Sequence, residues 1–355
     1  MAPRKAAMAS LSPEGLRAAV NARFGAGTML MASDPSFEVE RLSTGILSLD
    51  WVLNGGFARG RHTELYGVPN VGKTMCALKF IATQQAAGLK CAFVNVERSF
   101  DNTFAERLGV NTDELELIKH RQANQAIDIS EVLLRSDQFD VLVLDSIAAL
   151  VPLSEMENDM EAASMGMEQA KLMSKALRKL TAANDRTVFI WINQLRQNVG
   201  GVAFGKKTRT SGGMAMGFYA STRIEMVRTE TIKSKKEIIN PNTGKPIVKD
   251  EARGHRVLAR IEKEKAGARP YAETTFVFDN KKVRHDHIED LMYLGRQCGL
   301  VKLSGDSWYV RGYQTEKQHG RPKFRNWLAT NLAVAEELEE KIRARIGRNV
   351  FEDGA

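Results

Sequence analysis

The stretch "HTELYGVPNVGKT", residues 62–74, decides the fold of this chain. It begins with an apolar run at 62–67 and continues into a loop that ends in Gly-Lys-Thr. From Gly67 to Thr74 it fits the pattern G-x-x-x-x-G-K-[ST]. Glycines let backbone N–H groups converge on phosphate oxygens, and a following helix adds positive potential at its N-terminus. We therefore predict a phosphate-binding loop between a strand and a helix at 72–88.

The residues of this loop have separate chemical tasks. Lys73 would reach the β- and γ-phosphates of a nucleotide, and the Thr74 hydroxyl would ligate Mg²⁺. Because a strand precedes the loop and a helix follows it, a chance glycine-rich turn is the weaker interpretation. We expect the whole loop to bind the nucleotide: Gly67, Val68, Pro69, Asn70, Val71, Gly72, Lys73 and Thr74.

Three later apolar runs carry polar side chains near their carboxyl ends: Glu97 in 90–97, Asp145 in 139–146 and Gln194 in 187–194. Ligands of open α/β sheets bind at that edge. Asp145 is a candidate for the metal site, and Glu97 for the carboxylate that orients and deprotonates the attacking water. Gln194 offers an amide that can bond to a γ-phosphate. Taken alone, Asp145 could cap a turn and Glu97 could form a surface ion pair.

The composition is that of a globular chain without a membrane span. Its 355 residues are 43% hydrophobic and 26% charged, with a net charge of +8. The basic excess fits either a polyanionic partner or an ordinary solvated surface. The cysteines at 76, 91 and 298 form no CxxC pair, which argues against a disulfide framework or zinc site and favours the cytoplasm. No apolar run reaches the roughly 20 residues that cross a bilayer.

Strands alternate with helices from about residue 38 onward. This alternation predicts an α/β fold with a mostly parallel sheet that helices cover on both faces. Further strands are expected at 220–228, 255–264 and 273–279, and antiparallel pairing suits them. The polar segment 229–255 predicts a solvated hairpin or loop.

The two ends of the chain differ in pattern from the middle. Residues 13–24 fit a short helix capped by Ser12, and residues 28–33 fit a strand. Mixed helical and strand patterns after residue 283 suggest a small α/β unit. We therefore predict three parts: an N-terminal arm at 1–37, a core at 38–282 and a C-terminal domain at 283–355.

A basic, glycine-rich segment follows Gln194. It carries Arg196, Lys206, Lys207 and Arg209 before any acidic residue occurs. Such a segment could order on a phosphate backbone. A plain solvated loop is the alternative.

The helical run near residues 165–180 has an apolar face and a basic face. The apolar face consists of Leu172, Met173, Ala176, Leu177 and Leu180. The opposite face carries cations and a hydroxyl that suit phosphate contacts: Lys171, Ser174, Lys175 and Arg178. Because basic helix faces are commonly only solvated, this pattern is modest support for nucleic-acid binding.

Seven ordered segments resemble the bacterial RecA family of recombinases: "GVPNVGKT", "AFVNVERSFD", "VLVLDSIAALVP", "LMSKALRKLT", "WINQLRQNVGGVAFG", "SGGMAMGFYASTRIE" and "RIEKEKAGA". The resemblance covers roughly residues 12–345. It implies a RecA-like P-loop ATPase core, a short helix-strand polymerisation arm and a small C-terminal α/β domain. It also implies an ATP-dependent protein that polymerises on single-stranded DNA as a helical filament and exchanges strands with homologous duplex DNA. The family includes phage recombinases, and the divergence of this chain suits a phage-encoded member.

The resemblance assigns roles around the nucleotide. It implies that Lys73 and Glu97 act in hydrolysis and that Gln194 senses the γ-phosphate. Asp101 and Phe104 would contact adenine, and the family commonly has a tyrosine at the second of these positions. Phe104 keeps the stacking surface and drops the hydroxyl.

The resemblance also implies an interface and two DNA sites. Lys263 and Lys265 would reach the ATP of a neighbouring subunit, although a charged strand edge is the simpler alternative. Phe218 would lie in the filament interface. A secondary DNA site would include Arg228, Arg256 and Arg260.

Two DNA-binding loops are implied at 155–167 and 195–209. Met165 and Val199 hold positions where the family wedges apolar side chains between bases. Other implied DNA contacts are Ser174, Arg178, Arg196, Gly212 and Gly213. Single-strand-binding and loader proteins are the expected further partners.

Other functional classes share parts of this pattern. A helicase or a branch-migration ATPase could be built on the same core, but neither a large N-terminal helical domain nor a zinc-finger or protease-like region is visible. A DNA-coating protein without catalysis would not need Lys73, Thr74, Glu97 and Asp145 together. A metabolic P-loop kinase would leave the basic segments unexplained.

Overall fold

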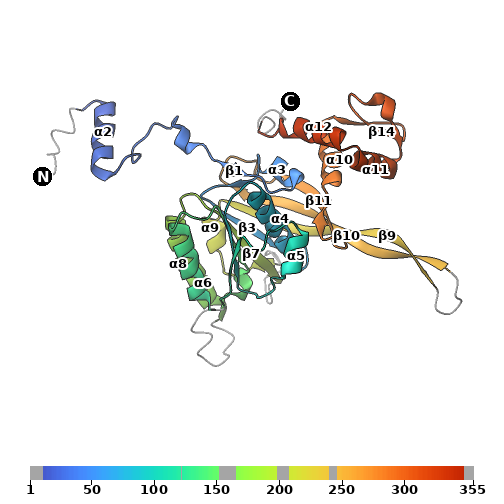
Figure 1. Cartoon of the computed structure of the whole chain (residues 1–355). Helices are drawn as coiled ribbons and strands as arrows, with labels where there is room; N and C mark the ends of the chain where they lie inside the picture. Colours follow the sequence, from blue (N-terminus) through green and yellow to red (C-terminus); the bar gives the residue numbers. More distant parts are fainter. Residues whose placement is uncertain (1–10, 121, 152–164, 198–207, 240–245, 348–355) are drawn as a thin grey trace, which may run out of the picture. The chain divides into compact units, whose positions relative to one another are not determined.

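A long sheet organises residues 41–355 in the computed structural model of the chain (Figure 1). The structure describes residues 11–120, 122–151, 165–197, 208–239 and 246–347. Within them the sheet has ten strands, in the order β12–β11–β10–β9–β3–β7–β6–β4–β5 with β8 beside β7. Its parallel part consists of β9 (Thr222–Ile239), β3 (His62–Gly67), β7 (Val188–Gln197), β6 (Val141–Asp145), β4 (Cys91–Asn95) and β5 (Leu115–Ile118).

Antiparallel strands extend the sheet beyond β9. They are β10 (Pro246–Glu264), β11 (Glu273–Asp279) and β12 (Arg284–His285), while β8 (Thr208–Thr210) pairs antiparallel with β7. Strands β9 and β10 form a long hairpin, whose register runs from Thr222–Glu264 to Ile239–Pro246. The prediction of a mostly parallel sheet with antiparallel additions is therefore confirmed. Of the two alternatives predicted for 229–255, hairpin or loop, the structure has the hairpin.

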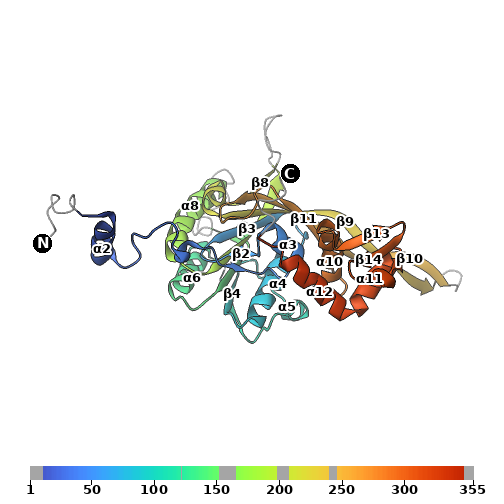
Figure 2. The ribbon, with the colours of Figure 1, turned by 90° about the horizontal axis from the view of Figure 1, so that it is seen from above.

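Helices cover both faces of the sheet, as the alternating pattern predicts (Figures 1 and 2). The apolar residues of β6 divide between two cores: Val143 packs with one set of helices, whereas Leu142 and Leu144 pack with the other. This division follows from the two-residue period of a strand. The first set is α3 (Leu47–Val52), α4 (Lys73–Ala86) and α5 (Asn102–Arg107), and the second is α6 (Ala123–Arg135), α8 (Met165–Ala183) and α9 (Ala215–Tyr219).

The N-terminal unit contains one helix, α2 (Pro13–Phe24), and one short 3-10 turn, η1 (Pro35–Phe37), among its described residues. The Ser12 hydroxyl caps α2 by accepting a hydrogen bond from the Gly15 N–H at 3.2 Å, as predicted. The predicted strand at 28–33 is wrong. The Asn21 side chain instead occupies both backbone polar groups of Met29, at 2.8 and 3.0 Å, so a neighbouring strand has no pairing partner there.

The C-terminal segment forms most of a third apolar core, to which α3 also contributes. Its elements are α10 (His287–Gln297), β13 (Val301–Ser304), β14 (Ser307–Val310), η3 (Gln314–Glu316), β15 (Gln318–His319), α11 (Arg321–Thr330) and α12 (Leu332–Arg343). Leu47 of α3 is fully buried among Leu291, Phe324 and Leu338. Short elements β1 (Arg41–Leu42), β2 (Phe57–Ala58) and η2 (Ile147–Ala149) complete the described fold.

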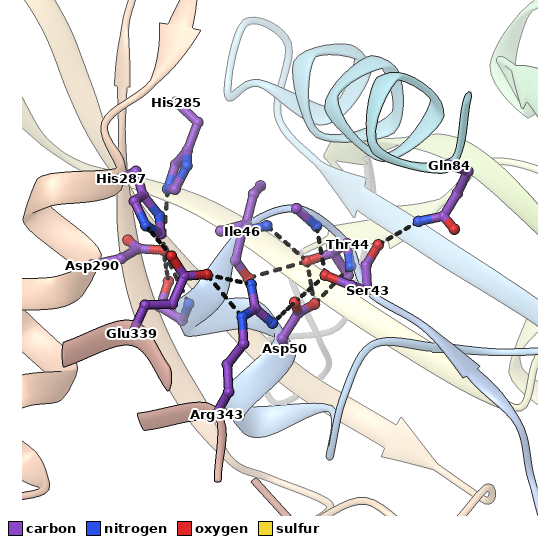
Figure 3. A network of polar contacts seen from close by, with 12 residues as sticks. Ser43, Thr44, Ile46, Asp50, Gln84, His285, His287, Asp290, Glu339 and Arg343 are labelled. Atoms are coloured by element: carbon purple, nitrogen blue, oxygen red, sulfur yellow. Dashed lines mark hydrogen bonds and ion pairs between the residues drawn. The ribbon is translucent and has the colours of Figure 1, made fainter. Parts of the chain in front are cut away.

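A polar network joins this segment to the core (Figure 3). Oδ2 of the buried Asp290 accepts hydrogen bonds from the backbone N–H and hydroxyl of Ser48, both at 3.0 Å. Asp50 accepts bonds from Ser43 and Thr44 and lies 3.4 Å from the guanidinium of Arg343. Burial raises the pKa of the Asp50 carboxyl, and these partners oppose the rise. The junction therefore depends on paired buried charges as well as on apolar contact.

In the part of the chain that the structure describes, no helix has the length and apolar character that crossing a membrane would require.

Candidate active site

The predicted phosphate-binding loop lies between β3 and α4, at the carboxyl edge of the parallel strands. Gly72 caps α4 with φ of 103°, a left-handed conformation that glycine adopts without strain. A Cβ on Gly72 would come within 2.8 Å of the Phe278 ring, and one on Gly67 within 2.3 Å of the Met226 carbonyl oxygen. Both glycines therefore allow neighbouring elements to approach the loop closely.

No side chain caps α4, so the N–H groups of its first turn point into the loop without an intrahelical partner. This end of a helix carries partial positive charge and suits phosphate oxygens. The Lys73 ammonium lies over the same loop, 3.1 Å from the Gly67 oxygen and 2.9 Å from the Val68 oxygen. Convergent donors and one cation thus surround the space that the loop encloses.

Thr74 and Asp145 meet across two neighbouring elements. The Thr74 hydroxyl donates to Oδ2 of Asp145 at 2.8 Å, and Asp145 is 2% exposed at the end of β6. Among the described residues no group of three or more His, Cys, Asp or Glu side chains could hold a metal by themselves. One hydroxyl and one carboxylate nevertheless fit Mg²⁺, which commonly takes one or two protein oxygens and completes its shell with waters and substrate phosphates.

Burial changes both charged groups of the loop. It lowers the pKa of the Lys73 ammonium, although the nearby carboxylates of Asp145 and Glu97 raise it. The pKa of Asp145 is raised to about 6, chiefly because the carboxyl is buried and secondarily because the Glu97 carboxylate is near. The Thr74 hydrogen bond and the Lys73 ammonium oppose this rise. A divalent cation and phosphate oxygens at this place would favour the charged forms of both groups.

Glu97 lies next to this pair, as the strand pattern predicts. Its backbone N–H donates to the Asp145 carbonyl oxygen at 3.2 Å, and its carboxylate accepts a bond from the Ser146 hydroxyl at 3.3 Å. The side chain is exposed. Glu97 can therefore contact solvent water beside the loop, which is what a general base for an attacking water requires.

A cavity of about 310 Å³ opens at the start of α4, lined by Asn70, Gly72, Lys73, Thr74, Met75, Phe104, His255 and Asn280. The Phe104 ring supplies an apolar wall suited to stacking on a base. The predicted adenine contact of Asp101 meets a competing role, because its carboxylate caps α5 by accepting a bond from the Phe104 N–H at 2.8 Å. Phe104 and Asp101 are thus brought to one place, but Asp101 already has a partner.

A larger cavity, of about 610 Å³, lies between α3, Tyr271 and the end of α12. It contains none of the predicted catalytic residues, and its lining offers neither a helix N-terminus nor a buried carboxylate. Because phosphate binding needs convergent donors, the smaller cavity is the candidate nucleotide site.

Gln194 lies beside the phosphate-binding loop, since its backbone is in register with Gly67 across the pairing of β7 and β3. Lys263 lies further along the sheet, on β10, and its ammonium donates to carbonyl oxygens at the end of α9. The acceptors are Gly217, Phe218 and Ala220, at 2.7, 3.1 and 2.6 Å. Burial and the adjacent Lys265 and Arg223 lower the pKa of Lys263 to about 8. Phe218 itself is 70% exposed.

The predicted DNA-binding residues within the described chain are placed on one helix and one strand. Ser174 and Arg178 are exposed on α8, with Lys171 and Lys175 on the same side, and Arg196 is exposed on β7. Gly212 and Gly213 have φ of 81° and 73° and pack against α8. A Cβ at Gly213 would lie 2.8 Å from that of Ala170, so packing alone accounts for this glycine.

Two of the three arginines predicted for a secondary DNA site already have acidic partners. Arg256 pairs with Glu230 at 3.1 Å and with Glu289 at 3.7 Å. Arg260 pairs with Glu273 at 2.7 Å and Glu225 at 3.6 Å. Phosphates would have to compete with these carboxylates. Arg228 is exposed and bonds to the Thr231 hydroxyl.

Some predicted residues lie outside the described part of the chain. Val199, Lys206 and Lys207 fall between β7 and β8, and most of the predicted first DNA loop falls between 152 and 164. The side chains of Met165 and Arg209, at the start of α8 and within β8, are also outside the description.

Sequence reasoning missed several residues of the site. The Asn193 side-chain oxygen accepts a hydrogen bond from the Gln194 backbone N–H at 2.8 Å. Successive residues of a strand point to opposite faces, so a second polar residue next to Gln194 in an apolar strand could have been identified as a polar group on the other face. His255 donates a ring N–H to the Val71 carbonyl oxygen at 3.1 Å and, with Asn280, lines the cavity. Both come from strands or turns about 200 residues after the loop, and no local pattern marks them.

Comparisons with known proteins extend over nearly the whole chain. The sequence model of the RecA N-terminal domain matches residues 15–259. Protein RecA of Chloroflexus aurantiacus is 38% identical over 334 residues, which are 92% of this chain and 89% of the relative. Protein RecA of Oleidesulfovibrio alaskensis is 36% identical over 351 residues, or 95% and 94% of the two chains. Protein RecA of Cereibacter sphaeroides is 38% identical over 340 residues, or 94% and 93%.

Each of these matches covers at least 92% of this chain. The family match alone covers more than half of the chain, and it includes Lys73, Glu97, Asp145 and Gln194. The chain therefore belongs to the RecA family, nucleotide-binding and DNA-dependent ATPases that act as recombinases in homologous pairing and strand exchange.

Proposed function

We propose that this recombinase holds ATP and Mg²⁺ at the loop between β3 and α4 and uses the occupancy of that site to control its DNA filament. The 2.8 Å contact between Thr74 and Asp145 supports the proposal most directly. It brings a hydroxyl and a carboxylate, the oxygen ligands that Mg²⁺ prefers, to the N-terminus of α4, which has no side-chain cap.

We assign the reacting roles to side chains around that contact. Lys73 neutralises the β- and γ-phosphates, Thr74 and Asp145 hold the metal, and Glu97 accepts a proton from the attacking water. The rest of the loop, from Gly67 to Gly72, donates backbone N–H groups. Mg²⁺ would supply charge neutralisation to the phosphates when bound. Phe104 covers the base, and Asp101 keeps Phe104 in place by capping α5.

Gln194 and two lysines carry the state of the nucleotide to the filament in this proposal. Gln194 bonds to the γ-phosphate of its own subunit, whereas Lys263 and Lys265 reach the nucleotide of a neighbour. To do so, Lys263 would exchange its bonds to the end of α9 for bonds to phosphate. Because α9 carries the exposed Phe218, this exchange would couple nucleotide binding to subunit contact.

We propose the exposed basic surfaces for DNA. Ser174, Arg178, Arg196 and the segment that includes Lys206, Lys207 and Arg209 would contact the first strand, with Gly212 and Gly213 allowing close approach. Met165 and Val199 would wedge between bases. Arg228 would contact a second strand. Arg256 and Arg260 would join it once their ion pairs with Glu230 and Glu273 are broken.

The unit at 1–37 would join neighbouring subunits, because Phe24 and Phe37 on it are 64% and 58% exposed. We place the ATPase core at 38–282 and a small C-terminal domain at 283–355. Single-strand-binding and loader proteins would assist filament formation, and the cytoplasm, where the DNA of a bacterial cell lies, is the proposed location.

Steady-state ATP hydrolysis tests the proposal directly. The rate should be measured without DNA, with single-stranded DNA and with duplex DNA at one fixed salt concentration, for the wild type and for Lys73→Ala. Strong stimulation by single strands in the wild type, together with loss of hydrolysis and strand exchange in Lys73→Ala, is expected. A DNA-independent rate, or normal strand exchange in Lys73→Ala, would overturn the assignment.

A further inference from the structure

A carboxylate lies buried beneath the phosphate-binding loop without taking part in nucleotide chemistry. Glu64, on β3, is completely inaccessible to solvent. Its Oε1 accepts a hydrogen bond from the Asn193 side-chain amide at 2.7 Å, and its Oε2 accepts one from Nε of Arg223 at 2.6 Å. Burying a carboxylate is costly unless it is paired and bonded, so both partners are needed to hold it there.

The contacts continue across four adjacent strands. The order β10–β9–β3–β7 places Glu262, Arg223, Glu64 and Asn193 on successive strands. Nη1 of Arg223 lies 2.7 Å from Oε2 of Glu262, and the Tyr66 hydroxyl donates to that same oxygen at 2.6 Å. The Arg223 guanidinium also stacks over the Tyr66 ring, 4.9 Å from its centroid. We call Asn193, Glu64, Arg223 and Glu262 the polar ladder.

The two ends of the polar ladder lie at the two ends of one segment, residues 211–220. At one end, the Asn193 amide donates to the Ser211 carbonyl oxygen at 3.0 Å. At the other end, Lys263 follows Glu262 directly on β10 and donates to the carbonyl oxygens of Gly217 and Ala220. The segment between these anchors contains α9 and the exposed Phe218.

The β7 end of the polar ladder also adjoins the nucleotide site. The Gln194 backbone N–H donates to the Asn193 side-chain oxygen at 2.8 Å, and the Ser211 N–H donates to the Gln194 carbonyl oxygen at 3.3 Å. A displacement of Gln194 therefore acts on Asn193 and Ser211 together. Because the interior of a sheet is tightly packed and every bond of the ladder is buried or half-buried, a shift at β7 is passed to its neighbours rather than absorbed by solvent.

We propose that Glu64 and Arg223 are positioning residues that couple the nucleotide-sensing strand β7 to the subunit-contacting helix α9. Neither touches the nucleotide. Glu64 orients Asn193 at one end of the segment 211–220, and Arg223 aligns β10, which presents Lys263 at the other end. This inference rests on the proposed roles of Gln194 and Phe218 and adds the internal connection between them.

Glu64→Gln is the sharpest test. The substitution keeps the volume and an oxygen that can accept from Asn193, but it places an amide donor against Nε of Arg223 and removes the negative charge. Affinity for a fluorescent ADP analogue should stay close to the wild-type value, because Glu64 lies outside the loop. The stimulation of ATP hydrolysis by single-stranded DNA should fall by about tenfold, a typical size for coupling between two sites.

Asp140→Asn is the matched control. Asp140 is another buried carboxylate, directly before β6, and it pairs with Arg59 at 2.9 Å, with Arg186 and with the Lys90 N–H, all of which lie outside 211–220. Its substitution should lower the melting temperature comparably and leave DNA stimulation unchanged. If Glu64→Gln does not fold, Arg223→Lys provides the second variant, since lysine keeps the charge but cannot bond to Glu64 and Glu262 in the same fork geometry.

The outcomes separate this inference from the proposed function. A wild type without DNA stimulation would remove the proposed function itself. A stimulated wild type together with full stimulation in Glu64→Gln, or in Arg223→Lys where that variant replaces it, would overturn the polar ladder alone. Equal loss of stimulation in Asp140→Asn would also overturn it, because lower stability would then explain the effect.

Discussion

Thr74 donates its hydroxyl hydrogen to Asp145 across 2.8 Å, although 71 positions of sequence separate them. The contact exists because β3 and β6 end at the same edge of the sheet and α4 begins there. Because a metal bound here would use the same carboxylate, its affinity would depend on the protonation state of Asp145.

Binding of Mg²⁺ with nucleotide should therefore weaken in acid. The pKa of Asp145 is raised to about 6, chiefly by burial, so the carboxylate is charged above that pH and protonated below it. A protonated carboxyl is a poor metal ligand, and the affinity for Mg²⁺–nucleotide should fall as the pH falls through about 6. Titration of a fluorescent nucleotide against Mg²⁺ at several pH values measures this. Asp145→Asn should bind weakly at every pH, and a wild-type affinity that is flat across this range would contradict the metal role.

Glu97→Gln should keep nucleotide affinity and slow turnover by about a hundredfold or more, since loss of a general base commonly costs that much. Filaments formed with ATP should then persist, because hydrolysis no longer releases them. Single-turnover hydrolysis and filament lifetime on single-stranded DNA provide the measurements. Glu114→Gln, an exposed glutamate ahead of β5, is the control, and an unchanged rate in Glu97→Gln would remove Glu97 from the reaction.

DNA-dependent hydrolysis should decline in alkali. Burial, Lys265 and Arg223 hold the pKa of Lys263 at about 8, well below the ordinary value of a lysine, so its ammonium is charged below that pH and neutral above it. A neutral amine cannot attract a neighbour's phosphates, and the stimulated rate should therefore fall as the pH rises through about 8. In Lys263→Arg the side chain stays charged, so the stimulated rate should no longer fall as the pH rises through about 8. The same pH profile in both proteins would show that another group titrates.

Replacing Arg196 with alanine should weaken binding to single-stranded DNA of any sequence. If the guanidinium contacts one phosphate, the slope of log affinity against log salt should become shallower by about 1. Arg135→Ala is a suitable control, because Arg135 is an exposed arginine on α6 that pairs with Glu131. Fluorescence anisotropy over a salt series measures both variants, and identical slopes would place Arg196 away from the phosphates.

Much of the fold could be predicted because its signals are local. The strand at 62–67, the glycines of the loop and the cap at Ser12 each depend on residues within a few positions, and the structure reproduces all three. The strand at 28–33 failed for a reason that is not local to it, since Asn21 of the preceding helix takes the hydrogen bonds of Met29.

Parts of the candidate site lay beyond sequence reasoning because they depend on distant partners. Nothing near Arg256 indicates that Glu289, on another element, holds its guanidinium. Nor does the pattern around Lys263 reveal the carbonyl oxygens at the end of α9. Spacing predicts which side chains reach the same edge of a sheet, but it cannot show which partners they choose once folded.

The junction of α3 with the C-terminal helices affects how the chain can be recombined with its relatives. Ser48 and Asp290 contact each other although 242 positions separate them, and Leu47 completes a core built from the last sixty or so residues of the described chain. A chimaera that exchanged only the segment after residue 283 would place a foreign surface against Leu47 and Ser48, which remain in the core. Functional hybrids between this protein and other members of its family should therefore exchange α3 together with that segment, as one inherited block.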